Sequence, residues 1–254
     1  MVTTQPRVSA SAVTADATSR PAVRRFYVGV TLFMIAIVLA GFWPSYFGRF
    51  ARGIAVDLPG VIHLHAATFM GWMALLLVQV FLVSTGQTRL HRKLGTFGIG
   101  YGCLVLLMGL LVSVAAPLHH LAAGDMPMDE AAGLLLSGLF DMALFAGFFA
   151  AAVANRRRPE THKRLIVLAT VALILPGAGR LVLAVAGLQP LVVLLVWLSP
   201  LLIAMSYDVL TRPRIHPAYL IGAPILIGRI PAHFIVIESE AGRDLGRSLL
   251  SALM

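Results

Sequence analysis

The chain has 254 residues, of which 59% are hydrophobic and only 12% are charged. Soluble domains average about 45–50% apolar and about 25% charged residues, so this composition excludes an ordinary soluble enzyme, a disordered protein and a coiled coil. The net charge of +9 would indicate nucleic acid for a soluble protein, but the basic residues lie in short connectors between apolar runs. We expect a membrane protein whose basic residues contact membrane lipids, with no nucleic-acid partner.

The amino-terminal region divides into a polar and an apolar part. Residues 1–25 are rich in Ser, Thr and Ala and lack an apolar period, which predicts a flexible cytoplasmic tail. Phe26–Phe47 is too long for the apolar core of a cleaved signal peptide, and it ends near the interfacial residues Trp43 and Tyr46. It is predicted to be the first transmembrane helix.

Six further apolar runs have about the 20 residues that a helix needs to cross the hydrocarbon core. They are Pro59–Ser84, Leu94–Leu118, Ala131–Ala154, Leu165–Leu188, Pro190–Tyr207 and His216–Ile237. The last is the least secure span, because it contains two prolines, Arg229 and His233. The sequence predicts one all-α bundle of about seven transmembrane helices over residues 26–237. Residues 238–254 place Leu245, Leu249 and Leu250 on one side and predict an interfacial amphipathic helix.

Orientation follows from the distribution of basic residues. Fourteen of the twenty lysines and arginines lie in the tail and in the second, fourth and sixth connectors, whereas the third connector is acidic. The positive-inside rule then predicts an amino terminus on the inner side.

Ionisable residues within the predicted spans form one layer, roughly 6–15 Å below the outer surface by helix rise. They are His63, His65, Asp141, Arg180, Arg229 and His233. Charges at such depth cost about 2.5–3.5 kcal/mol each, so we expect Asp141 to form an ion pair with Arg180, or alternatively with Arg229. This layer is either a structural device that fixes helix register or a site for a ligand with an anionic or carbonyl end, such as a quinone, a lipid headgroup or haem propionates.

Histidines are the candidate metal ligands, above all His65, His91 and His162. His91 and His162 sit at inner helix starts, where they either contact lipid phosphate or act as axial ligands of an inner haem. His65, with one of His119, His120 or His233, would bind an outer haem, with Arg180 and Arg229 pairing its propionates.

Catalytic motifs are not found. The chain has one cysteine, Cys103, which excludes an internal disulfide and a c-type haem attachment. The sequence contains no HExxH, GxSxG, P-loop or paired-carboxylate pattern, so no catalytic residue is predicted. The glycines near the start of Leu94–Leu118 favour close helix packing instead of nucleotide binding.

A combined pattern carries a resemblance. Ile62-His63-Leu64-His65-Ala66, Leu90-His91-Arg92-Lys93-Leu94-Gly95 and Arg158-Pro159-x-x-His162-Lys163-Arg164-Leu165 resemble a group of bacterial predicted membrane proteins of unknown function. This resemblance implies a multi-pass protein of the bacterial inner (plasma) membrane. A looser likeness to membrane cytochromes b implies haem held between histidines of a helical bundle.

The leading hypothesis is therefore a redox-linked membrane protein that binds haem b or a quinone. The alternative is a non-catalytic transport protein or an accessory subunit of another membrane protein, in which Asp141 and Arg180 form a structural or gating pair.

Overall fold

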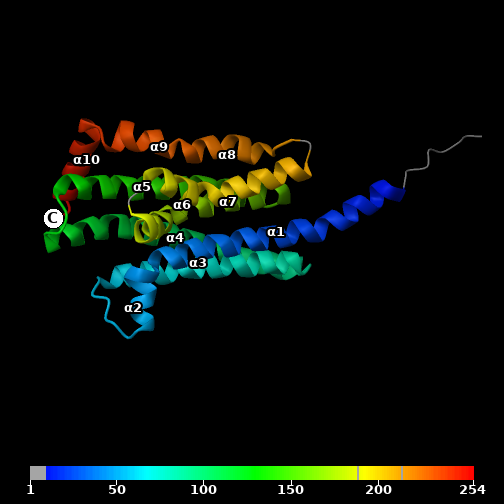
Figure 1. Ribbon diagram of the computed structural model, residues 1–254, viewed down its shortest axis with the longest axis horizontal. Coiled ribbons are helices and arrows are strands. Elements are labelled where there is room, and N and C mark those ends of the chain that lie inside the picture. Colours follow the sequence, from blue (N-terminus) through cyan, green and yellow to red (C-terminus); the bar gives the residue numbers. More distant parts are fainter. Residues whose placement is uncertain (1–9, 188, 213) are drawn as a thin grey trace, which may run out of the picture.

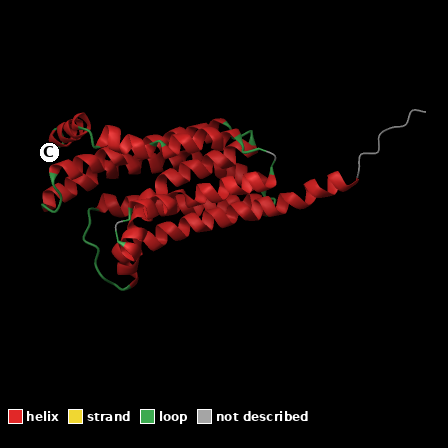
Figure 2. Cartoon of the chain, turned by 45° about the horizontal axis from the view of Figure 1, so that its top comes forward, coloured by secondary structure: helices red, strands yellow, loops and turns green. Residues whose placement is uncertain are grey.

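The computed structural model describes residues 10–187, 189–212 and 214–254, which form a helical bundle without strands (Figures 1 and 2). The α-helices are α1 (Ala10–Phe42), α2 (Gly48–Ala51), α3 (Gly60–Ser84), α4 (Thr88–Ala123), α5 (Met128–Ala154), α6 (Pro159–Ala186), α7 (Pro190–Thr211), α8 (Pro217–Ile227), α9 (Arg229–Ala232) and α10 (Glu240–Ser251). Two π-helical segments, η1 (Trp43–Phe47) and η2 (His233–Ile237), complete them.

Seven segments of the described chain are long and apolar enough to cross a membrane. The first combines part of α1 with η1 and α2, and the last runs through α8, α9 and η2 over Pro217–Ile237. The predicted all-α bundle of seven helices is thus confirmed.

Several helices extend beyond the apolar runs from which they were predicted. The α3–α4, α5–α6 and α7–α8 connections lie together at one end of the bundle, which we call the basic end (Figure 1). There α4 already begins at Thr88 and α6 at Pro159. Proline occupies the first turn of α6, α7 and α8, where its missing N–H costs no hydrogen bond. The basic residues in the first turns of α4 and α6 therefore lie on helix faces and not in loops.

The first helix also begins earlier than expected. Helix α1 starts at Ala10, so most of the predicted tail is helical. The stretch is rich in alanine, the best helix former, and it continues directly into an apolar helix. Residues 1–9 of the predicted tail lie outside the described residues, as does Leu188, the predicted last residue of the fifth run.

Helix α6 is the centre of the bundle. In its most apolar stretch 67% of the residues are buried, compared with 33% or less in the other six spans. Helices α1, α3, α4, α5 and α6 pack in a closed ring, each against the next and α6 against α1. Helices α7 and α8 cover the outer side of α6. Between the ring helices, the Trp72 ring meets Phe145 and Phe149 edge to face at 5.5 Å, and its Nε1 donates to Thr170 Oγ1 at 3.4 Å.

The carboxyl-terminal helix α10 lies across the end of the bundle opposite the basic end (Figure 1). It packs against α5 through Gly246, where an added Cβ would lie 2.7 Å from that of Ala132, and through the buried Leu250. Leu245 and Leu249 stay exposed. Part of the apolar face of α10 is therefore covered by protein, and its position at the membrane interface stays a prediction.

Candidate functional site

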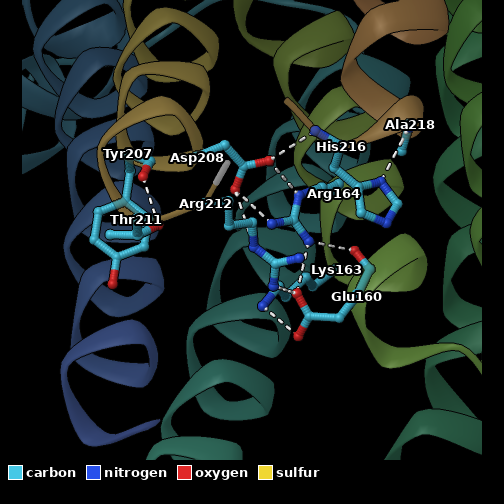
Figure 3. Close-up of polar contacts among 9 residues, drawn as sticks. All are labelled: Glu160, Lys163, Arg164, Tyr207, Asp208, Thr211, Arg212, His216 and Ala218. Atoms are coloured by element: carbon cyan, nitrogen blue, oxygen red, sulfur yellow. Dashed lines mark hydrogen bonds and ion pairs between the residues drawn. The ribbon is translucent and has the colours of Figure 1, made fainter. Parts of the chain in front are cut away.

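A buried ion pair joins α6 to α7 near the basic end. Arg164 Nε donates to Asp208 Oδ2 at 2.8 Å, and a second guanidinium nitrogen bonds the other carboxylate oxygen (Figure 3). Each side chain is only 1% exposed. This bidentate geometry is the strongest that an arginine and a carboxylate can form, and in it the two buried charges neutralise each other.

Glu160 extends this pair into a network (Figure 3). Its carboxylate accepts from Arg164 Nη1 at 2.9 Å and from Lys163 Nζ at 2.8 Å, and it also pairs with Arg212. Three cations therefore meet two carboxylates, counting Asp208. Aromatic rings cover the cations, because the Tyr219 ring lies 5.6 Å from Arg164 Cζ and the Tyr27 ring 4.9 Å from Lys163 Nζ. The saturated contacts suit a fixed structural joint between α6, α7 and α8 better than a proton-exchanging group.

His216 connects this network to the start of α8. Its backbone N–H donates to Asp208 Oδ2 at 3.4 Å, and its Nδ1 accepts from the Ala218 N–H at 3.1 Å. The accepting nitrogen must be unprotonated. Burial, together with the neighbouring Arg164 and Arg212, lowers the pKa of the His216 imidazole from its usual value. His216 is therefore a neutral N-cap of α8 at neutral pH.

This geometry predicts a pH effect. Since the pKa of His216 is lower in the folded than in the unfolded protein, the unfolded state binds more protons as the pH falls, and stability falls with it. Asparagine keeps an N-cap oxygen but does not titrate. His216→Asn is thus expected to lose less melting temperature than the wild type between pH 7.5 and 5.5, measured on the protein in detergent. An equal loss in both proteins would contradict the assignment.

The opposite half holds a second ion pair, in which Asp141 binds the second of the two cations expected for it. Arg229 Nε donates to Asp141 Oδ1 at 2.7 Å and a second nitrogen reaches Oδ2 at 3.3 Å. Arg180 instead lies with its Cζ 4.7 Å from the centre of the Phe42 ring and donates to the Pro176 carbonyl at 3.3 Å. The Asp141–Arg180 pairing is therefore corrected to Asp141–Arg229. The reason is rotational, because α6 turns Arg180 toward α1 whereas Asp141 is on α5.

The histidines of this half are distributed among different partners. His63 Nδ1 lies 2.8 Å from the Tyr46 hydroxyl, and His120 Nδ1 lies 2.9 Å from Asp125 Oδ1, next to His119. His233 lies between Ser137, at 3.5 Å, and Glu238, at 3.0 Å. The ring of His65 lies 4.0 Å from that of Phe69, and its Nδ1 is buried without a hydrogen-bond partner.

His65 and His233, one of the residue pairs predicted to bind an outer haem, lie on segments that pack against different helices. Helix α3 packs against α1 and α4, whereas η2 packs against α5, α9 and α10. Among the described residues no three histidine, cysteine, aspartate or glutamate side chains form a group that could hold a metal ion. The pairwise ligation predicted for two haems, with His65 at the outer one and with His91 and His162 at the inner one, stays a prediction.

His91 and His162 both lie at the basic end. His91 lies in the first turns of α4 and His162 in the first turns of α6, and each residue is partly buried. The Nδ1–H of His162 donates to the Ala152 carbonyl of α5 at 2.8 Å. The Gln79 amide, in its satisfied orientation, donates to the His91 carbonyl at 3.1 Å and to the His91 ring Nδ1 at 2.5 Å, and it accepts from the Gly95 N–H at 2.9 Å.

Sequence reasoning missed Asp208 altogether and treated Arg164 as a connector residue. The signal available was the position of Asp208, an acid in the last turn of an apolar helix at the basic end, four residues before Arg212. Such a carboxylate needs a cationic partner, and the basic connectors supply several.

Together these features define a multi-pass helical membrane protein with an ion-pair network and a histidine pair at the same end. Comparison of the chain with protein-family models, with curated proteins and with solved structures found no match.

Proposed function

We propose that the protein is a redox-linked membrane protein and that His91 and His162 are axial ligands of one b-type haem at the basic end. The observation that carries this proposal is the hydrogen bond from His162 Nδ1 to the Ala152 carbonyl. It fixes the tautomer in which Nε2 is unprotonated, the form that binds iron, and second-shell carbonyls of this kind are typical of metal-ligating histidines.

Gln79 of α3 positions the ring of His91, because its amide nitrogen donates to the ring Nδ1 as well as to the His91 carbonyl. In that orientation Nε2 carries the proton, so iron binding at Nε2 requires the Gln79 amide to turn and accept from Nδ1–H. The two histidines come from α4 and α6, which do not follow each other in the closed ring of helices. A bound haem would supply one-electron transfer, and its propionates would lie near the arginines of the basic end.

The test is the visible absorption spectrum of the protein purified in mild detergent, as isolated and after dithionite. We expect a Soret band that sharpens on reduction together with a new α-band, as in b-type haem proteins. His91→Ala and His162→Ala should each abolish the low-spin α-band, because one axial ligand is lost. His120→Ala is the control, since His120 is at the opposite end and bonds Asp125. A featureless spectrum of folded wild-type protein, still flat after haem is added, would overturn the proposal.

The opposite half supports a second function, that of a transport or accessory protein. Asp141 and Arg229 form a charged pair inside the seven-helix region with side chains only 11–12% exposed, and His233 follows Arg229 by one turn. A charged pair at such depth is costly and often functional. The spectrum described above separates the two functions, because a haem-free folded protein would leave this pair as the candidate site.

A further inference from the structure

A pocket of about 700 Å³ lies between α5 and α8, with α6 as its floor, on the side of α6 away from the helix ring. Its size falls in the range of about 300–1,000 Å³ that is typical of small-molecule sites. It exists because α8 packs closely on α6 through Gly222, where an added Cβ would overlap the Leu168 side chain. Helix α5 makes no comparable contact with α8.

The pocket is apolar along the helices and polar at one end. The apolar part includes Ala143, Gly147 and Phe148 of α5 and Ile221 and Ile225 of α8. Both isoleucines are more than half exposed, at 65% and 51%, although they belong to a predicted span. In a membrane these residues face acyl chains, so the pocket opens to lipid.

The polar end lies at the basic end of the bundle and is lined by Asn155, Arg158, Thr161 and His216. His216 accepts on Nδ1, which leaves its Nε2–H as a donor. The amino-terminal ends of α6 and α8 lie here, and their helix dipoles favour an anion. The two connections that form this end carry three further exposed arginines: Arg156, Arg157 and Arg214.

We propose that this pocket binds an anionic phospholipid, with one acyl chain between α5 and α8 and the phosphate at Arg158 and His216. Charge complementarity selects the occupant. A zwitterionic lipid would offer the same chain but no net charge to the arginines, and basic pockets between helices are known to favour anionic headgroups. The proposal is independent of haem binding, because the His162 ring bonds to α5 within the bundle wall and is not part of the pocket lining.

The test uses thermal melting of the detergent-solubilised full-length protein, titrated with phosphatidylglycerol or with phosphatidylcholine of the same chains. We expect phosphatidylglycerol to raise the melting temperature at concentrations at which phosphatidylcholine does not. Arg158→Gln should weaken the apparent affinity for phosphatidylglycerol roughly tenfold, since it removes a charge-assisted bond. Arg92→Gln, which changes another exposed arginine of the basic end outside the pocket, should leave that affinity unchanged.

Two variants test the chain-binding part. An added Cβ at Gly147 meets no atom within 4 Å and Gly147 lines the pocket, so Gly147→Leu should fill pocket space and abolish the preference. Gly133→Leu, on the same helix, equally free of contacts and outside the pocket, is the control. If Gly147→Leu fails to fold, Ala143→Leu replaces it, because Ala143 is an exposed lining residue.

Three results would overturn the proposal. One is equal stabilisation by the two lipids, which indicates unspecific solvation. Another is that Gly147→Leu keeps the full preference of the wild type for phosphatidylglycerol over phosphatidylcholine. The third is stabilisation by a water-soluble quinone that phosphatidylglycerol cannot displace, which would assign the pocket to a quinone.

Discussion

Arg164→Met is expected to lower the free energy of unfolding by about 3–5 kcal/mol, the usual cost of removing one member of a buried ion pair. The reason is that Asp208 is only 1% exposed and loses its bidentate partner. The remaining cation, Arg212, has its Nε 4.0 Å away and is already engaged by Glu160. In a chain of this size the melting temperature should fall by roughly 6–20 °C.

The reverse change is expected to cost less. In Asp208→Asn, Arg164 keeps Glu160, whose carboxylate lies 2.9 Å from Nη1 and whose carbonyl oxygen lies 2.7 Å from it. The double variant Arg164→Met/Asp208→Leu removes both charges and should recover most of the loss, because a buried ion pair often contributes little more than an apolar pair. Thermal melting in detergent checks all three proteins. Equal losses in the two single variants, or no recovery in the double variant, would contradict the network as described.

Gly41→Ala is expected to disrupt the contact between α1 and α6. The added Cβ would overlap the carbonyl oxygen of Gly177, so the obstacle is backbone and cannot rotate away. We expect a loss of about 3 kcal/mol, at the upper end of the range for overpacking. The measurement is again the melting temperature, together with the yield of monodisperse protein.

Gly29→Ala is the matched control for this prediction. It lies on the same helix, but an added Cβ there meets no atom within 4 Å. Alanine is the better helix former, so this variant should be neutral or slightly stabilising. If both substitutions had the same effect, the loss would reflect α1 itself and not its crossing with α6.

Composition and run length sufficed to predict the seven spans, because crossing a hydrocarbon layer imposes a nearly fixed number of apolar residues. Helix ends were predicted less well. Lys163 and Arg164 were assigned to a connector because they are charged, yet α6 begins at Pro159 and carries them on its first turns. Hydropathy measures where a helix leaves the apolar layer, not where its backbone hydrogen bonds stop.

The partners of the buried charges could not be predicted for a different reason. Asp141 had two candidate cations at similar depth, Arg180 and Arg229. Only the rotation of each helix about its axis decides between them, and that rotation is set by packing, which one sequence does not show. The Asp208–Arg164 pair was harder still, since its members are 44 residues apart and belong to consecutive helices whose mutual register is equally unknown.

The closed ring of helices has a consequence for biosynthesis. A chain emerging from the ribosome delivers α1 first, but α6, the helix against which α1 packs at the Gly41–Gly177 crossing, is made only after α3, α4 and α5. Until then α1 has only α3 beside it among the large helices. The ring therefore closes late in synthesis, and the contacts of Trp72 between its helices are completed only then. A nascent chain that stops before α6 contains α1, α3, α4 and α5 but cannot close the ring.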